Sequence, residues 1–344
     1  MKLPTIMDIA SEAGVNKCVV SHVLHDDAYA AKVRPETRQR ILAISEKLGY
    51  RRNTLASATR TGRVNTIAVI LNLMKYQNMT PFNQIMAGIM LESSARRQSV
   101  KVFPEDDLED SFHQIVESRI DKIIMISIEH DLREKAAELA EKYSLELVYA
   151  YEHGHGRFPA VNTDNAEMTS RMVHFLVEKG HTRIGLLCVP HWAHYEEERH
   201  TGYLRGMKEC GLKTDSHWIS CSDDTEHAIK NMLALPKKQR PTAFVALSDG
   251  IAATVQSYAL RNGLHFPKDI SAIGIGDTET ARQLVYPVTT MRESLQETGK
   301  LLARLVLGEK PDIRSDENNV YRTHAELIER ESVFTINNGM EVKK

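Results

Sequence analysis

Hydrophobic positions follow two different patterns along the chain. In residues 1–63 they recur at helical spacing, as in Ile6, Ile9 and Ala13. After Arg63, short apolar runs rich in β-branched residues alternate with helical stretches. Continuous apolar strands that alternate with helices are typical of parallel sheets covered on both faces. The pattern therefore predicts a small all-helical head followed by an α/β body.

The first 25 residues predict two short helices separated by a tight turn. Thr5 and Asp8 fit a capping box at the start of the first helix, and Asn16 can cap the second. Gly14 stands where the turn needs a permissive backbone. This arrangement predicts a helix-turn-helix. Its second helix would direct five residues toward a DNA groove: Asn16, Lys17, Cys18, Ser21 and His22.

A third helix and an excess of positive charge complete the head. The helix begins near Pro35, presents an apolar stripe and ends at Gly49. Residues 1–63 carry 11 Lys and Arg against 6 Asp and Glu, whereas the remainder carries 33 against 40. A basic head on an acidic body favours a polyanion-binding function. The alternative is a three-helix bundle without a role in DNA binding.

The body predicts two doubly wound parallel-sheet subdomains, because roughly 280 residues are too many for one such core. Ligands of open α/β sheets bind beyond the carboxyl ends of the strands, so two facing subdomains would form a ligand cleft. The predicted strands are Thr66–Leu71, Ile123–Ile126, Leu145–Tyr149, Ile184–Val189, Ala243–Leu247 and Ile270–Ile275. The predicted helices are Phe82–Arg97, Asp110–Ser118, Leu132–Tyr143, Glu167–Glu178, Glu197–Cys210, Glu226–Leu235 and Ile251–Asn262.

Motifs in both parts are shared with a known family. The head contains TIMDIASEAGVNKCVVSHVL, PETRQRILAISEKLGYRRN and LASATRTGR, and the body contains VNTDNAEMTSR, EKGHTRIGLL, PTAFVALSD and FPKDISAIGIGD. Together they resemble the LacI/GalR family of transcriptional regulators. The resemblance implies a body like the periplasmic sugar-binding proteins, a homodimer and a small-molecule effector in the cleft. It implies a head over 1–52, a hinge helix and linker over 53–63, and a body over 64–344. The two subdomains would span about 64–162 plus 293–321 and about 163–292 plus 322–344.

The resemblance also implies how the head reads DNA. The second helix would lie in the major groove, and a hinge helix starting at Asn53 would enter the minor groove at the centre of a pseudo-palindromic operator. Thr5 is a further expected DNA contact in the head. The hinge residues carried over are Asn53, Leu55, Ala56, Ser57, Thr59 and Arg60. His22 replaces the usual Arg, and Thr59 replaces the usual Leu wedge. A threonine is smaller and polar, so we expect it to unstack the central bases less.

Arg199 is the first effector contact that the resemblance implies, because it stands three residues before Gly202-Tyr203. Its alternative is a surface ion pair with Glu196 or Glu197. Asp249 follows a strand, and its alternative is a helix N-cap. The full set of expected effector contacts is Tyr149, Tyr151, Trp192, Arg199, Ser248, Asp249, Asp277 and Glu293.

Three positions depart from the family pattern in this cleft. Gly276 replaces the first of two aspartates, Ala150 replaces another Asp, and Glu293 replaces a frequent Gln. The lost carboxylates would accept hydrogen bonds from a neutral sugar, so we expect either a different effector or other groups in their place. Aromatic rings stack well on a sugar face, and the nearby candidates are Tyr149, Tyr151, His191, Trp192, His194 and Tyr195. The alternative is that several of them are only rim or core residues.

Other chemistry finds little support in the chain. His191-x-x-His194 and His153-x-His155 lack a third ligand at a recognisable spacing for a metal. Four cysteines are scattered without a CxxC pair, which favours reduced thiols in the cytoplasm. No apolar run is long enough for a membrane span. We expect neither a cofactor nor catalytic activity.

The sequence therefore predicts a cytoplasmic DNA-binding transcriptional regulator. It would act as a repressor whose affinity for its operator is controlled by a sugar or sugar derivative. The alternative is a solute-binding or sugar-processing protein whose basic head is incidental.

Overall fold

The computed structural model describes residues 4–25, 28–51, 64–72, 80–189 and 194–336. The chain divides into two compact units, Met1–Val64 and Asn65–Lys344, which we call the head and the body. The division falls one residue after the expected start of the body. Each unit has its own buried core, and each is described here by itself.

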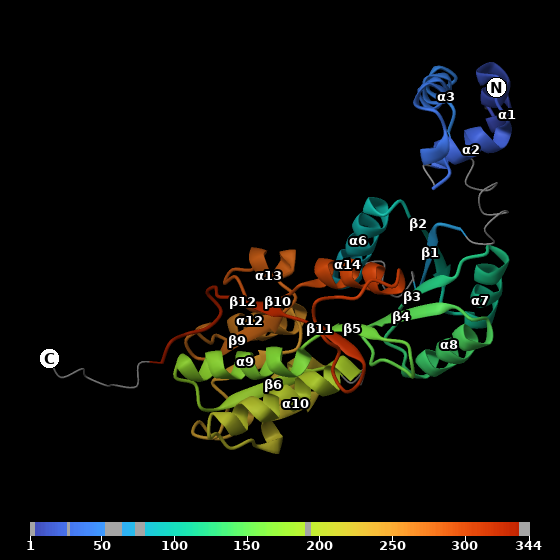
Figure 1. Ribbon diagram of the computed structural model, residues 1–344. Coiled ribbons are helices and arrows are strands. Elements are labelled where there is room, and N and C mark those ends of the chain that lie inside the picture. The colour runs from blue at the N-terminus through green and yellow to red at the C-terminus, as the bar shows by residue number, and fades with distance from the viewer. Residues whose placement is uncertain (1–3, 26–27, 52–63, 73–79, 190–193, 337–344) are drawn as a thin grey trace. The chain divides into compact units, whose positions relative to one another are not determined.

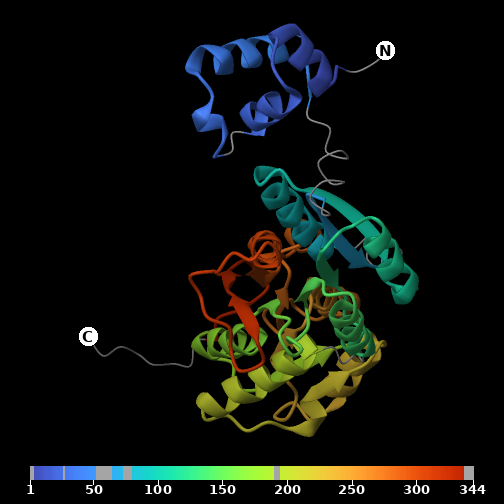
Figure 2. The ribbon, with the colours of Figure 1, turned by 45° about the vertical axis from the view of Figure 1, so that its right-hand side comes forward.

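The head is a bundle of short helices, drawn in blue in Figures 1 and 2. Its elements are α1 (Ile6–Ala13), α2 (Lys17–His25), the 3₁₀ helix η1 (Ala30–Lys32) and α3 (Pro35–Lys47). The capping box is present, since Asp8 N donates to Thr5 Oγ1 (3.4 Å) and Thr5 N donates to Asp8 Oδ2 (2.7 Å). Gly14 has φ 62°, and Cys18 N donates to Asn16 Oδ1 (2.8 Å). The helix-turn-helix predicted from local signals is confirmed.

The body contains two six-stranded sheets. The first has the order β11-β5-β4-β3-β1-β2 and is parallel throughout. Its strands are β1 (Thr66–Leu71), β2 (Ser99–Pro104), β3 (Lys122–Ile126), β4 (Glu146–Ala150), β5 (Ala160–Thr163) and β11 (Val320–Thr323). The helices of this subdomain are α6 (Thr80–Ala95), α7 (Leu108–Glu117), α8 (His130–Lys142) and α14 (Leu295–Val306). We call this part subdomain one.

The second sheet has the order β12-β10-β9-β8-β6-β7, with only β12 antiparallel to its neighbour. Its strands are β6 (Ile184–Cys188), β7 (Ile219–Cys221), β8 (Ala243–Ala246), β9 (Ser271–Ile275), β10 (Thr289–Glu293) and β12 (Ala325–Ile328). Its helices are α9 (Asn165–Glu178), α10 (His194–Glu209), η2 (Ser216–Trp218), α11 (Thr225–Ala234), α12 (Asp249–Arg261) and α13 (Glu279–Gln283). We call this part subdomain two.

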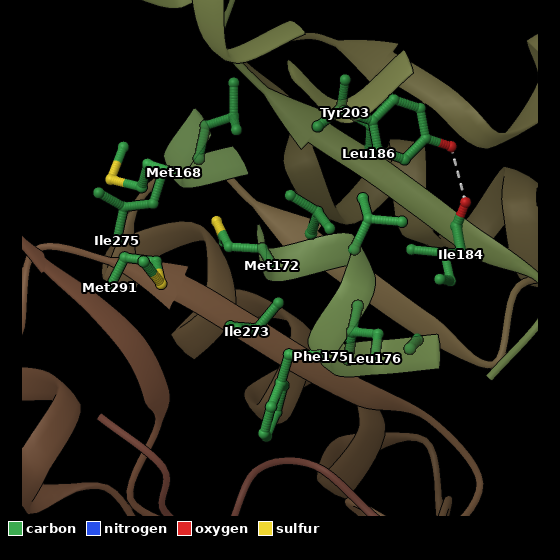
Figure 3. Close-up of a cluster of buried hydrophobic side chains, with 14 of the residues drawn as sticks. Met168, Met172, Phe175, Leu176, Ile184, Leu186, Tyr203, Ile273, Ile275 and Met291 are labelled. Carbon is green, nitrogen blue, oxygen red and sulfur yellow. Dashed lines mark hydrogen bonds between the residues drawn. The ribbon is translucent and has the colours of Figure 1, made fainter. Parts of the chain in front are cut away.

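Figure 3 shows the core on one face of the second sheet. Met172 and Leu176 of α9 pack with Leu186 of β6 and Ile273 of β9, and all four are buried. The Tyr203 hydroxyl donates to the Ile184 carbonyl (2.8 Å), so this buried polar group is paired. Burying these side chains provides most of the driving force for folding this face.

The chain crosses between the subdomains three times: after Thr163, after Glu293 and between Thr323 and Ala325. These crossings lie within about two residues of the expected boundaries. All six predicted strands and seven predicted helices are present, with ends shifted by a few residues. The hydrophobic pattern did not predict β2, β5, β7, β10, β11, β12, α13 and α14. Several of these strands are short or alternate with polar residues, so they lack a continuous apolar run.

The expectation of reduced thiols is wrong for two cysteines. Cys188 and Cys221 are the last residues of the paired strands β6 and β7, and they form a disulfide. Spacing in the sequence did not indicate this, because the two cysteines are 33 positions apart.

In the described part of the chain, none of the helices has the length and apolarity to cross a membrane.

A helix pair packs closely at glycines in each subdomain. A Cβ on Gly88 of α6 would lie 2.1 Å from the Gln296 carbonyl oxygen, and one on Gly299 of α14 would lie 2.1 Å from the Ile85 carbonyl oxygen. In subdomain two, a Cβ on Gly202 of α10 would lie 2.2 Å from the Ala166 carbonyl oxygen. These glycines therefore serve close backbone approach.

We expect Gly88→Ala to lower the free energy of unfolding of the body by about 1–3 kcal/mol, the usual cost of overpacking. The helices must separate, because the clash is with backbone rather than with a flexible side chain. Thermal or urea unfolding measures the effect. Ser94→Ala, at an exposed position on the same helix, is the control and should change little. Equal stability of both variants and the wild type would contradict this packing.

Candidate functional site

The body contains a cavity of about 520 Å³ lined by both subdomains. Its wall is formed by segments that follow β3, β4, β6, β8, β9 and β10, together with the N-terminal parts of α6, α10 and α12. This is the expected place for a ligand of open α/β sheets. The lining residues are Pro81, Phe82, Ile128, Tyr151, Val189, Tyr195, Glu196, Arg199, Leu247, Ser248, Asp249, Gly250, Ile251, Ile275, Gly276, Thr278 and Glu293.

Arg199 lies in this wall and is held by three partners. Its Nε donates to Asn165 Oδ1 (2.8 Å), its Nη1 to the Leu247 carbonyl (3.3 Å) and its Nη2 to Glu293 Oε1 (3.2 Å). The side chain is buried, with 7% of the residue exposed. Its ion-pair partner is therefore Glu293, and the alternative of a surface pair with Glu196 or Glu197 is wrong. Within the described residues, three of the five guanidinium N–H groups have an acceptor, which leaves two for a ligand.

Glu293 joins this arginine to the crossing between the subdomains. Its Oε1 also accepts a hydrogen bond from Thr163 Oγ1 (2.9 Å). Thr163 ends β5 of subdomain one, whereas Glu293 ends β10 of subdomain two. A ligand that contacts the Arg199–Glu293 pair thus touches a point shared by both subdomains.

Asp249 also lines the cavity, but its carboxylate is already bonded by the protein. Oδ1 accepts from Thr290 Oγ1 (2.6 Å), and Oδ2 accepts from Thr278 N (2.7 Å) and Oγ1 (3.0 Å). The N-cap of α12 is Ser248, whose hydroxyl accepts from Ile251 N (3.2 Å), so the capping alternative for Asp249 is wrong.

Gly276 explains why Asp249 can sit there. A Cβ on Gly276 would lie 3.4 Å from Asp249 Oδ2, and one on Gly274 would lie 2.4 Å from Asp249 Oδ1. An aspartate at 276 would place a second carboxylate beside the first, and like charges at that range repel. The aspartate that the family usually has at position 276 is thus absent, and both oxygens of the neighbouring Asp249 carboxylate accept hydrogen bonds from the protein itself.

Aromatic rings form one side of the cavity. Phe82 of α6 lies 5.1 Å from Tyr151, and Tyr151 lies 5.7 Å from Tyr195 of α10, between ring centroids. The Arg199 guanidinium lies 4.9 Å from the centre of the Tyr195 ring, a cation–π contact. Burial, and then the nearby charge of Glu196, raise the pKa of Tyr195 to about 12, so its hydroxyl stays protonated.

Three expected effector contacts do not belong to the described cavity wall. Tyr149 lies inside β4, and its hydroxyl donates to the Arg133 carbonyl of α8 (2.9 Å). Asp277 is buried and accepts from Arg282, Arg292 and Arg330. Burial raises the pKa of the Asp277 carboxyl, but these arginines outweigh it and hold the pKa well below its usual range. Trp192 lies outside the described residues. Tyr149 and Asp277 are therefore corrected to structural positions.

The head presents its expected DNA-reading residues in two ways. Asn16, Lys17 and Cys18 are exposed at the start of α2. Ser21 and His22 are half-buried, and the His22 ring lies 5.0 Å from the Tyr29 ring. Thr5 serves as the cap of α1. The hinge residues Asn53, Leu55, Ala56, Ser57, Thr59 and Arg60 lie outside the described residues.

Among the residues that are described, no three His, Cys, Asp or Glu side chains form a group suited to a metal ion.

Comparison with known proteins identifies both parts. Residues 5–53 match the bacterial regulatory proteins of the lacI family, and residues 173–333 match the periplasmic binding protein-like domain. The head is of the lacI family, and the body carries a periplasmic-binding-protein-like domain.

Whole-length relatives agree with this assignment. The chain is 27% identical over 350 residues to the HTH-type transcriptional repressor PurR of Vibrio vulnificus, covering 97% of this chain and 100% of the relative. It is 27% identical over 354 residues to the HTH-type transcriptional regulator RegA of Clostridium saccharobutylicum, covering 96% and 99%.

Solved structures show the same lacI-family fold. The lac repressor dimer bound to operator and the anti-inducer ONPF matches with TM-score 0.74 and 20% identity, covering 97% of this chain and 100% of that one. The transcriptional regulator CelR in complex with cellobiose matches with TM-score 0.67 and 22% identity, covering 96% and 99%.

Much of the cavity wall was not predicted from the sequence. Phe82, Ile128, Val189, Leu247 and Ile275 were not expected there, because an apolar residue at a strand end looks like any core residue. Tyr195 carried a signal as a nearby aromatic residue, and Gly276 carried one because the family usually has an aspartate at that position. Tyr151, Arg199, Ser248, Asp249 and Glu293 were assigned and do line the cavity.

A network beside the cavity connects the two subdomains of the body. Glu198 of α10 accepts from Arg322 Nη2 (2.7 Å) and Nη1 (2.9 Å), and lies 3.0 Å from His153 Nε2. Asn165 Nδ2 donates to Glu198 Oε2 (3.2 Å), while its Oδ1 binds Arg199. The network therefore continues directly into the cavity wall.

Two histidines stack at the same junction. The His153 ring, from the segment after β4, lies 4.1 Å from the His194 ring of α10, with the planes 11° apart. His194 Nδ1 lies 2.7 Å from Glu152 Oε2. Each imidazole thus faces a carboxylate of the opposite subdomain, since His153 faces Glu198 and His194 faces Glu152.

We expect Glu198→Gln to destabilise the body by roughly 3 kcal/mol at neutral pH. Burial raises the pKa of the Glu198 carboxyl, but hydrogen bonds from His153 and Arg322 outweigh it and bring the pKa from 4.5 to about 2. Each pKa unit corresponds to about 1.4 kcal/mol. A depressed pKa contributes stability above 4.5 that is lost as the pH falls toward 2.

Unfolding midpoints measured between acid and neutral pH check this. The difference between the wild type and Glu198→Gln should shrink below pH 4.5. Glu197→Gln, at the adjacent exposed position, is the matched control. A constant difference across this range would contradict the role given to the Glu198 charge.

Proposed function

We propose that this protein is a DNA-binding transcriptional repressor that responds to a small molecule. The observation that carries the proposal is the union of two sites in one chain. A capped helix-turn-helix exposes Asn16, Lys17 and Cys18 on a basic head, and a cavity with a buried arginine lies between two subdomains. A solute-binding or sugar-processing protein would need only the second.

The proposed DNA complex is a homodimer on a pseudo-palindromic operator. Dimers of helix-turn-helix proteins place two recognition helices in successive major grooves. Lys17, Ser21 and His22 of α2 are the proposed groove contacts, together with the hinge residues from Asn53 onward. A DNA-binding regulator would act in the cytoplasm. Among its relatives are regulators, so we propose a binding protein and no enzyme.

The proposed effector is a sugar or a sugar derivative. Support comes from the two remaining N–H groups of Arg199, from the Glu293 carboxylate and from the rings of Tyr151 and Tyr195, which suit hydroxyls and a sugar face respectively. The CelR neighbour is described with cellobiose. Because Asp249 is bonded internally, Arg199 and Glu293 would carry most of the charged hydrogen bonds to the ligand.

Closure of the cleft is the proposed signal. A ligand bound between Tyr151 of subdomain one and Arg199 of subdomain two would favour one arrangement of the two subdomains. Such a ligand changes operator affinity only as far as it binds the two arrangements differently.

We expect Lys17→Ala to weaken binding to a duplex selected from a random pool by about tenfold or more. The change removes a cation facing the DNA and lowers the salt dependence of binding by about one phosphate contact. Isotherms at several salt concentrations measure both effects. Lys47→Ala makes the same charge change on α3, in an exposed pair with Glu12, and is the control.

Two results would refute the DNA-binding proposal. One is equal affinity of Lys17→Ala and the wild type for the selected duplex. The other is full DNA binding by a body that lacks residues 1–63. A folded body without DNA binding is the expected result of that deletion.

We expect Arg199→Lys to weaken effector binding by about tenfold or more, because lysine cannot reproduce the planar fork of donors. A thermal-shift screen of sugars and phosphosugars identifies the effector, since a ligand at about 100 times its Kd stabilises by roughly 2.7 kcal/mol. Titration calorimetry then compares the variants, with Arg205→Lys on the exposed side of α10 as the control. Equal affinity of Arg199→Lys and the wild type would remove Arg199 from the effector site.

A further inference from the structure

The Cys188–Cys221 disulfide lies at the edge of the cavity. Cys188 and Cys221 face each other in register at the ends of β6 and β7, with Cα atoms 4.3 Å apart. The next residue after Cys188 is Val189, which lines the cavity. On the other side of Cys188, the Leu187 carbonyl oxygen accepts a hydrogen bond from Leu247 N (3.0 Å). The Leu247 carbonyl in turn accepts from Arg199.

The strand that the disulfide secures is a weak part of the sheet. β7 is an edge strand of three residues, and β6 is its only neighbour in the sheet of the described residues. A bond from Ser222 N to the Cys188 carbonyl (2.9 Å) continues this short ladder. Opening the disulfide would leave β7 and the end of β6 joined by a few backbone hydrogen bonds, while the rest of β6 stays paired with β8.

The site also accommodates the reduced state. The Ser220 carbonyl oxygen lies 3.5 Å from Cys188 Sγ. A disulfide sulfur cannot donate a hydrogen bond, but a thiol can. Cys188 is buried, whereas Cys221 is half-buried. The pair thus combines a more accessible cysteine with a buried partner directly beside it.

We propose that Cys188 and Cys221 form a reversible thiol–disulfide site that tunes the order of the effector cavity. This rests on the proposed function in one respect: a DNA-binding regulator works in a compartment where thiols are kept reduced. Disulfides in such compartments are usually transient and serve redox sensing or catalysis rather than architecture. The oxidised pair holds the β6 end and Val189 in place, and the reduced pair releases them.

The oxidant is a peroxide. The Cys221 thiolate attacks one peroxide oxygen, the O–O bond breaks, and the departing hydroxide takes a proton to become water. The Cys188 thiolate then attacks the resulting sulfenic acid, forms the S–S bond and expels the second oxygen, which leaves as water after protonation. Two thiols and one hydrogen peroxide thus give one disulfide and two waters. A dithiol reductant, itself oxidised to a disulfide, reverses the reaction.

The other two cysteines allow a clean test. Cys18 is exposed on α2 of the head, and Cys210 is half-buried with its sulfur 3.5 Å from His174 Nδ1. Burial, and then the charges of Glu209 and Glu178, raise the pKa of the Cys210 thiol, which disfavours its reactive thiolate. Replacing both by serine leaves only the proposed pair in the full chain.

The experiment uses this Cys18→Ser, Cys210→Ser protein. It is reduced with dithiothreitol, desalted, treated with hydrogen peroxide and then returned to reduced glutathione, with thiols counted by alkylation and mass at each step. Hydrogen exchange is measured in both states. We expect a disulfide to form and reopen. We expect amides in 188–189, 219–222 and 247–251 to exchange about threefold faster or more when reduced, while those of β1, β3 and β4 stay unchanged.

Adding Cys221→Ser should remove the response to peroxide and give the exchange pattern of the reduced protein; if that variant does not fold, the two redox states of the parent still decide. Three results would overturn the proposal: no disulfide forms with peroxide, the disulfide does not reopen in glutathione, or it cycles without changing exchange at the cavity wall. None of these measurements uses DNA or an effector, so failure here is distinct from failure of the proposed function.

Discussion

The buried pair of Arg199 and Glu293 is the interaction on which the body depends. Taking two charges out of water is expensive, and their attraction repays this only when further hydrogen bonds satisfy both groups. Here Asn165, the Leu247 carbonyl and Thr163 supply those bonds. The partners come from both subdomains, so the pair ties the ends of β5, β8 and β10 to the start of α9 and to α10. Removing either charge would leave the other buried in the cavity wall without its ion-pair partner.

The same pair shows how polar groups of the cavity wall are held by the protein itself. Asp249 is a second example, with three bonds to Thr278 and Thr290. The remaining groups are few and well positioned, which favours selectivity, since a preorganised site loses little entropy on binding. Gly276 fits this arrangement because it leaves room beside the Asp249 carboxylate.

Close helix packing stabilises each subdomain internally, whereas charged networks connect one subdomain to the other. The helix pairs α6–α14 and α9–α10 approach at glycines, where backbone meets backbone, so each pair is closely packed. Contacts between the subdomains include ionic and aromatic ones, such as Glu198 with Arg322 and His153, and Tyr151 with Tyr195. Interactions of this kind can exchange partners or water more readily than a packed core, which suits the proposed closure of the cleft.

Local signals in the sequence were enough for the helix-turn-helix and for the main strands. The bond between Thr5 and Asp8, the turn at Gly14 and the cap at Asn16 involve residues within three positions of one another, so they do not depend on the rest of the fold. The sequence also predicts β1, β3, β6, β8 and β9 from continuous apolar runs, which occur because both faces of these strands are covered. The family resemblance added the positions of Arg199 and Glu293, though not the bond between them.

Tertiary structure alone decided which of the candidate residues meet. Tyr149 and Tyr151 are two positions apart, yet one bonds to α8 and the other lines the cavity, because β4 ends between them. The Asp277 carboxylate accepts hydrogen bonds from three arginines, two of which lie 15 and 53 residues further along the chain. Cys188 and Cys221 become neighbours only through the register of β6 and β7. Such contacts depend on strand order and on where each strand stops, and hydrophobic periodicity carries no information about either.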